Sequence, residues 1–312
     1  MRIYEEPAMS SAQMHQTNTE IESSECHLDF FTMTTEKSCV YLSLLNNTYI
    51  ISAGVNNDNS SIPALKTSIN QALSTSNPET LAINTNNTLD CNPTTLLNEI
   101  AADSLPIKTT TFNTIPYHIR SVIDEIDEVS TDNWDYPDTV QTEIDSDRFP
   151  VYDIHIDGSY ITPRENRTER AGYGYSIRRD NNIIMFKCDW LPDCKSSVEA
   201  EFKAAEKAIN DLVKLCVESG STINRPYVNI ITDNCELARA LSIDTTKNLP
   251  NKQQVRDSYS NICQTADSCN SLGVSLKNRQ TVSLSDALAT ASKNSKMKPI
   301  LSTLTPNKHA SF

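Results

Sequence analysis

The chain has 312 residues, enough for two domains of ordinary size, with 27 basic and 40 acidic side chains and a formal net charge of −13. The charge is uneven: residues 1–150 carry 22 acidic and 6 basic side chains (net −16), whereas residues 151–312 carry 18 and 21 (net +3). The overall acidity therefore does not exclude a nucleic-acid partner for the C-terminal half.

Nine cysteines are scattered along the chain, and no two have the Cys-x-x-Cys spacing of a zinc ribbon or a thioredoxin-like motif. Their odd number and apolar surroundings favour buried thiols in a reducing compartment. Residues 1–19 lack the apolar core of a secretory signal, and no apolar run reaches membrane-spanning length. We therefore expect a soluble, cytoplasmic protein without a membrane partner.

Residues 1–35 are polar and rich in Ser, Thr and Met, and we expect them to be disordered. Residues 36–129 predict an αβ domain with the element order β-β-α-β-α-β-α. It begins with two apolar runs around Asn46-Asn47, a pattern typical of a β-hairpin. The remaining expected elements are a helix at 62–73, a strand at 81–85, a helix at 94–102, a strand at 107–112 and a helix at 115–129.

Residues 130–147 predict an acidic linker, the last part of a like-charged run over 124–147 that favours an extended, solvated segment and a domain boundary. Trp134 and Tyr136 lie within it. Two interpretations stay open: a solvated tether or salt-adapted surface, or a strip that lies over a basic groove and competes with nucleic acid.

Residues 148–295 predict a second domain, followed by a flexible tail at 296–312. The run 152–157 alternates as a strand does, and Gly158-Ser159 indicates its exit into a turn. Residues 180–182 predict the turn of a second hairpin. The other expected elements are strands at 172–177, 183–188, 228–233 and 274–276, and helices at 197–216, 236–241, 250–269 and 284–293.

Four acidic residues in this half occupy definite positions on these elements. Asp157 and Asp233 end two strands, Glu201 lies in the first turns of the long helix, and Asp286 lies in the opening turn of the last one. If the two strands are parallel neighbours, their carboxylates meet at one edge of the sheet. Four converging carboxylates repel one another unless a cation neutralises them, and such oxygen ligands favour Mg²⁺ or Mn²⁺. His155 shares the strand face of Asp157, but packing beneath a helix is the favoured reading.

The motifs around these acids resemble the ribonuclease H family over residues 150–293. They are Asp157-Gly158-Ser159 after a strand, Ala200-Glu201-x-x-Ala204-Ala205 early in a helix, Thr232-Asp233-Asn234 after a later strand, and Ser285-Asp286-Ala287-Leu288-Ala289 opening the last helix. The resemblance implies an α/β fold with a ribonuclease-H-like mixed five-stranded sheet flanked by helices. It also implies an Asp-Glu-Asp-Asp site for two divalent ions, Mg²⁺ or Mn²⁺.

The resemblance further implies a role for each residue. Asp157 would bridge two ions, Glu201 and Asp233 would hold one, and Asp286 the other, during hydrolysis of the RNA strand of an RNA–DNA hybrid. Gly158, Ser159 and Asn234 are weaker substrate-binding candidates. Two features depart from the family: the loop 277–283 lacks the mobile histidine of many members, and no basic, Trp-containing handle helix is visible.

The N-terminal half contains an echo of these motifs. Residues 81–87 align with 228–234, and residues 61–65 with 197–201, which places Asn86 at the position of Asp233 and Leu65 at that of Glu201. The first expected strand ends in Leu44-Leu45-Asn46 instead of an acid. The smaller αβ domain is therefore either a degenerate ribonuclease-H-like copy that cannot hold metal or an αβ domain of another type.

The sequence thus favours a metal-dependent endonuclease whose partner is nucleic acid. Two alternatives remain: a binding module of the same fold that does not cut, and the nuclease part of a retroelement or mobile element. No polymerase-like Tyr-x-Asp-Asp occurs in the chain. The oligomeric state is not determined by these patterns.

Overall fold

The computed structural model describes most of both halves of the chain. The described residues are 25–34, 38–46, 48–56, 60–76, 79–85, 106–111, 114–131, 151–162, 170–179, 182–218, 225–242, 253–295, 298–299 and 304–305. None of the helices within these ranges combines the length and the apolar character that crossing a membrane requires.

The N-terminal sheet is built around β1 (Glu25–Thr34), which pairs antiparallel with β2 (Cys39–Leu45) and parallel with β4 (Thr80–Thr85). β3 (Tyr49–Asn56) lies beyond β2, and β5 (Ile107–Thr111) lies beyond β4. Helix α1 (Ile62–Ser76) packs on one face of the sheet, and α3 (Tyr117–Thr131) packs on the other.

The expected disorder of residues 1–35 is wrong for residues 25–34, which form the central strand of this sheet. Cys26, Leu28 and Phe30 alternate along β1 and are fully buried against α1. This period-two pattern is present in the sequence, but it directly follows a long polar stretch whose composition dominated the prediction. Residues 1–24 lie outside the described residues.

The predicted hairpin, strands and helices of this half are confirmed where the structure describes them. The hairpin turns at Asn46, whose φ of 52° is in the left-handed region that Asn tolerates better than most residues. The strands at 81–85 and 107–112 and the helices at 62–73 and 115–129 agree with β4, β5, α1 and α3. Residues 124–131 of the acidic run are helical instead of extended. The predicted helix at 94–102 and the linker at 130–147, beyond Thr131, lie outside the described residues.

The C-terminal sheet is mixed, and its strands run in the order β10-β9-β6-β7-β8. β6 (Val151–Ile161), β7 (Arg170–Arg179) and β8 (Asn182–Trp190) are antiparallel, whereas β9 (Tyr227–Thr232) and β10 (Ser271–Leu276) run parallel to β6. Its helices are α4 (Ser197–Glu218), α5 (Cys235–Ser242), α6 (Gln253–Ala266) and α7 (Ser283–Ser295). The predicted mixed five-stranded sheet with flanking helices is confirmed for the described part of this half.

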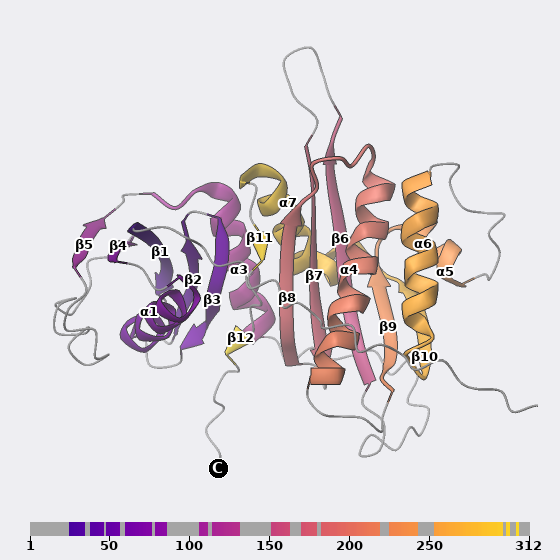
Figure 1. Ribbon diagram of the computed structural model, residues 1–312, viewed down its shortest axis with the longest axis horizontal. Helices are drawn as coiled ribbons and strands as arrows, with labels where there is room; N and C mark the ends of the chain where they lie inside the picture. Colours follow the sequence, from indigo (N-terminus) through magenta and orange to yellow (C-terminus); the bar gives the residue numbers. More distant parts are fainter. Residues whose placement is uncertain are drawn as a thin grey trace, which may run out of the picture.

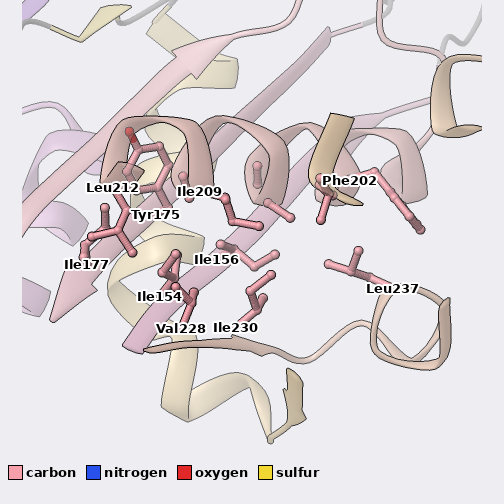
Figure 2. Packing of buried hydrophobic residues seen from close by; sticks show 14 of the residues in the cluster. Ile154, Ile156, Tyr175, Ile177, Phe202, Ile209, Leu212, Val228, Ile230 and Leu237 are labelled. Atoms are coloured by element: carbon pink, nitrogen blue, oxygen red, sulfur yellow. The ribbon is translucent and has the colours of Figure 1, made fainter. Parts of the chain in front are cut away.

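The core of this half lies between the sheet and α4, because the apolar face of α4 lies against the strands. Phe202, Ile209 and Leu212 meet Ile154 and Ile156 of β6, and all five are fully buried (Figure 2). Helix α6 packs beside α4. There the buried Glu206 of α4 accepts hydrogen bonds from Ser258 and Asn261 at 2.8 Å, which satisfies its carboxylate.

The two sheets share one topology. In the order β3-β2-β1-β4-β5, the N-terminal strands have the same neighbours and relative directions as β8-β7-β6-β9-β10. Helices α1 and α3 also follow β3 and β5, as α4 and α7 follow β8 and β10. The described part of the smaller domain therefore repeats the architecture of the larger one, as the degenerate-copy interpretation requires.

A single apolar cluster joins the two halves. Helices α3 and α7 pack against each other between the sheets (Figure 1). Leu284, Leu288 and Ala291 of α7 and Phe186 of β8 belong to the same buried cluster as side chains of the N-terminal half. Those partners are Phe31, Val40, Leu42, Leu44, Ile50, Ala53, Val55, Ile119, Val122, Ile123 and Ile126. The face of α7 that points away from its own sheet is thus covered by the other half.

The expected flexible tail at 296–312 is wrong for two short segments. β11 (Lys298–Pro299) and β12 (Leu304–Thr305) both pair parallel with β3, so the end of the chain returns to the N-terminal sheet. Sequence periodicity has no signal for strands of two residues, because alternation needs at least four to be visible.

The shared cluster predicts a large cost for truncating one of its members. Leu288→Ala should lower the free energy of unfolding by about 2–5 kcal/mol, because Leu288 is fully buried between the halves. Val217→Ala, on the 69% exposed position of α4, is the matched control and should change it by no more than about 0.5 kcal/mol. Urea unfolding of both variants tests this, and equal effects would contradict the shared core.

Candidate metal centre

Asp157 lies where one neighbour of its strand ends. The parallel pairing of β6 with β9 stops at His155 opposite Ile231, whereas the antiparallel pairing with β7 continues to Ile161. Gly158-Ser159 is therefore part of β6, and the turn expected there is wrong, since pairing with β7 carries the strand past the glycine. The end of β9 leaves the sheet open beside Asp157, which is 6% exposed.

Glu201 and Asp233 reach the same place from two other elements. Asp233 directly follows β9, and Glu201 lies in the second turn of α4. One carboxylate oxygen from each of Asp157, Glu201 and Asp233 lies within 4.8 Å of the other two. The predicted convergence of these three acids is found in the structure.

Gly158 explains how α4 comes so close to β6. A Cβ at this position would overlap the backbone nitrogen of Glu201 and lie 2.5 Å from the carbonyl carbon of Ala200. The N–H of Gly158 donates a hydrogen bond to the Glu201 carboxylate. Gly158, predicted as a substrate residue, thus has a packing role that sequence reasoning missed.

The start of α4 is fixed by a serine cap. The Oγ atom of Ser196 accepts the N–H of Glu199 at 3.2 Å, and Glu199 accepts the N–H of Lys195 at 2.9 Å. These bonds satisfy backbone donors that a helix N-terminus leaves free. They hold the turn that carries Glu201.

Asp286 approaches Asp157 from the other face of the sheet. Gly172 and Gly174 of β7 allow α7 to lie directly on the strand, because a Cβ at Gly174 would overlap the carbonyl oxygen of Ser285. Asp286 is close enough to Asp157 for a hydrogen bond between the two carboxyls. It also forms a bidentate ion pair with Arg279, with Nε–Oδ2 at 3.1 Å and Nη2–Oδ1 at 2.5 Å.

This crowding shifts the ionisation of the buried acids. Burial, followed by the charges of Asp286 and Asp233, raises the pKa of Asp157 to about 8. Burial, followed by the charges of Asp157 and Asp233, raises the pKa of Glu201 well above its usual range. Without a cation, the site therefore holds protons at neutral pH.

A divalent cation fits this arrangement. The Oε2 atom of Glu201 is buried and has no hydrogen-bond partner among the described residues. The potential metal ligands from Asp157, Glu201 and Asp233 are all carboxylate oxygens, the ligands that Mg²⁺ and Mn²⁺ prefer. An ion there would replace the protons and remove the repulsion.

His155 packs in the interior, as the favoured reading of the sequence predicted. It is 2% exposed, and its Nδ1 lies 2.9 Å from the carbonyl oxygen of Thr281. Burial, together with the charge of Arg178, lowers the pKa of His155 to about 3, so the ring is neutral over the ordinary pH range.

Sequence reasoning missed two cations that border the acids. Arg279 precedes α7 in a short 3-10 turn (Arg279–Val282), and Lys293 lies in the last turns of α7. The Nζ atom of Lys293 donates to the Oγ atom of Ser159 at 2.5 Å, and burial lowers the pKa of this lysine despite the charges of Asp286 and Asp157. The only sequence signal for Arg279 was the basic composition of the loop at 277–283, and Lys293 had none.

The remaining substrate candidate, Asn234, caps α5. Its Oδ1 atom accepts the N–H groups of Glu236 and Leu237 at 3.0 Å. Whether Gly158, Ser159 or Asn234 also contacts a substrate stays a prediction.

The N-terminal sheet has apolar side chains where the acids lie. Both parallel ladders begin at the first residue of the central strand, with Glu25 opposite Thr80 and Val151 opposite Tyr227. In this register Phe31 corresponds to Asp157, and it is buried in the cluster shared by the halves. Leu65, aligned with Glu201, is fully buried.

The proposed correspondence of Leu44-Leu45-Asn46 with the strand of Asp157 is wrong. Those residues end β2 and its turn, and β2 corresponds to β7. The error follows directly from missing β1, which shifted the count of strands by one. Asn86, aligned with Asp233, lies outside the described residues.

No protein-family model and no curated protein matches the chain. Solved structures similar to it include the N-terminal RNase H domain of a Mycobacterium tuberculosis protein (15% identity, 47% of this chain, 96% of that chain, TM-score 0.39). Another is the RNase H1 of the archaeon Halobacterium salinarum (17% identity, 45% of this chain, 95% of that chain, TM-score 0.36). A third is the protease–reverse transcriptase of prototype foamy virus (13% identity, 89% of this chain, 41% of that chain, TM-score 0.35).

The mixed five-stranded sheet of the C-terminal half and its helices bring all four predicted acids around the end of β9.

The close approach of α7 to β7 predicts that Gly174 does not tolerate a side chain. Gly174→Ala should cost about 1–3 kcal/mol of stability, because its Cβ would lie 2.6 Å from both Ala289 N and Leu288 Cβ. Gly273→Ala is the control, since the nearest atoms there are 3.7 Å away. Thermal unfolding compares the two variants, and equal melting temperatures would show that α7 has room to move.

The raised pKa of Asp157 predicts an unusual pH dependence for the metal-free protein. The folded state keeps a proton that the unfolded state, with a carboxyl pKa of about 3.9, has lost. Stability should therefore fall as the pH rises from about 4 to about 8, by about 1.4 kcal/mol per unit of pKa shift at most. Asp157→Asn should flatten this dependence and raise the melting temperature at pH 8.

Thermal unfolding in a chelating buffer at pH 5 and pH 8 measures the effect. Added Mn²⁺ should then raise the melting temperature of the wild type at pH 8 and not that of the variant. Parallel pH profiles for the two proteins would contradict the buried, protonated Asp157.

Proposed function

We propose that the C-terminal half is a metal-dependent endonuclease that hydrolyses the RNA strand of RNA–DNA hybrids. The observation that carries the proposal is the group of Asp157, Glu201 and Asp233, whose oxygens lie within 4.8 Å of one another with Asp286 against Asp157. Such a group destabilises the fold through repulsion between its carboxylates unless it binds a cation. The choice of hybrid as substrate rests on the resemblance of the four motifs to the ribonuclease H family.

In this proposal the acids hold two Mg²⁺ or Mn²⁺ ions, with Asp157 shared, Glu201 and Asp233 on one side and Asp286 on the other. When bound, such ions lower the pKa of a bound water and stabilise charge on a phosphodiester. The residues of the chain bring the oxygens together and keep bulk water from Asp157 and Glu201, which are 6% and 4% exposed.

The cations around the acids support a phosphodiester substrate. Arg279 and Lys293 lie within electrostatic reach of both Asp157 and Asp286, at the open end of the sheet. Ser159, which accepts from Lys293, lies two residues beyond Asp157 on β6. A nucleic-acid strand bound over Asp157 would place its phosphates between Arg279 and Lys293.

In this proposal the N-terminal half is a scaffold that holds no metal, because Phe31 and Leu65 occupy two of the positions that would need acids. A reducing cytoplasm is the proposed location, in keeping with the free, buried thiols of Cys26, Cys188 and Cys269.

Cleavage assays separate the nuclease from a binding module that does not cut. With Mg²⁺ or Mn²⁺, the wild type should cut the RNA strand of a hybrid. Asp157→Asn should lower the rate at least about 100-fold, because substitution of a residue that only hydrogen-bonds to a metal ligand can already lower activity by that factor. Asp193→Asn, an exposed acid in the turn after β8, is the control and should keep full activity.

Binding of the same hybrid in chelating buffer completes the test, and Asp157→Asn should bind it at least as tightly as the wild type. A wild type that binds hybrid with neither metal affinity nor cleavage would support the binding module and contradict the nuclease.

A further inference from the structure

The fourth acid, Asp286, differs from the other three in its partner. Asp157, Glu201 and Asp233 converge without a cationic partner within 4.0 Å among the described residues, whereas both oxygens of Asp286 are bound by the guanidinium of Arg279. The fork-to-fork geometry, with contacts of 3.1 and 2.5 Å, is the strongest form of an Arg–carboxylate pair.

Arg279 compensates a local excess of negative charge. Asp286 faces Asp157 on the sheet, and burial, together with the charges of Glu128 and Asp286, raises the pKa of Glu125 of α3. Glu125 also bonds to Ser283 at the start of α7, so the N-terminal half adds a carboxylate to this region. The guanidinium is the cation in direct contact with Asp286 among the described residues.

The backbone of Arg279 is held by the hydrogen bonds of its turn, whereas its side chain is held by Asp286. Asn278 caps the 3-10 turn through bonds to Thr281, and the carbonyl oxygen of Thr281 contacts the buried ring of His155 at 2.9 Å. By contrast, the side chain of Arg279 is 69% exposed, and its contacts beyond Asp286 are long-range charges. The guanidinium can therefore exchange partners while the turn stays in place.

We propose that Arg279 occupies the place of the second divalent cation in the free protein and leaves Asp286 for a phosphate of bound nucleic acid. The inference rests on the proposed function, because it assumes that the four acids hold metal. A guanidinium and a divalent ion on one carboxylate repel each other, so the second ion binds well only after Arg279 has moved. Phosphate is the natural second partner, since it accepts the same bidentate fork.

Metal binding without nucleic acid is the first test. Titration of the full chain with Mn²⁺, followed by electron paramagnetic resonance of the free ion, should give one ion per wild-type chain. Arg279→Gln should bind a second ion roughly 5- to 150-fold more tightly than the wild type does, the usual size of a coupling between two sites. Adding Asp286→Asn to this variant should remove the second ion.

Arg225→Gln is the matched control, because Arg225 precedes β9 at the opposite end of the strand from Asp233 and contacts the carbonyl oxygen of Asp267 instead. It should leave the Mn²⁺ count unchanged. Two equally tight ions in the wild type, or one in Arg279→Gln, would overturn the inference and leave the nuclease proposal intact. No ion in either protein would overturn both.

Binding of an RNA–DNA hybrid in chelating buffer tests the second partner. Arg279→Gln should weaken binding and reduce the slope of log K against log salt by about 1, the change expected for one lost phosphate contact. Arg225→Gln should keep the wild-type slope. An unchanged slope in Arg279→Gln would show that the ion pair with Asp286 is only a surface salt bridge.

Discussion

Repulsion between buried carboxylates is the constraint to which the C-terminal half is adapted. Asp157 and Glu201 are almost fully buried beside Asp233 and Asp286, and burial with mutual repulsion raises the pKa of the first two. The fold forces this proximity through glycines: Gly158 admits α4, and Gly174 admits α7. The apolar core under α4 and the cluster around α7 supply the stability that the acids reduce.

The two halves share one topology, but the carboxylates that repel one another lie in the C-terminal half. In the N-terminal sheet, Phe31 and Leu65 take the positions of Asp157 and Glu201, and both contribute to apolar clusters. Burying them stabilises the fold, whereas burying two carboxylates does so only with a cation. The N-terminal half, which lacks these two acids, packs its helix α3 against α7.

Much of this arrangement could be predicted from the sequence, because the strongest signals are local. The stripe of α4, the hairpins and the order of the four acids were each visible in the residues. β1 was missed because its alternation is short and follows a polar stretch. Phe31, the counterpart of Asp157, was missed with it. The pairing of Arg279 with Asp286 depends on how a turn and a helix meet in space, and a seven-residue separation at the start of a helix does not reveal it. The strands β11 and β12 exist only through pairing with β3.

Helix α7 links these features, because it contributes to both the acidic site and the interface. One side lies on Gly172 and Gly174 and carries Asp286 to Asp157, while Leu284 and Leu288 pack against the N-terminal half. A shift of α3 would move α7, and α7 cannot move toward the sheet because the glycines already leave no space. The position of Asp286 relative to the other acids therefore depends on residues of the N-terminal half. The N-terminal half is thus a structural part of the candidate site, although Phe31 and Leu65 occupy two of the corresponding positions in its own fold.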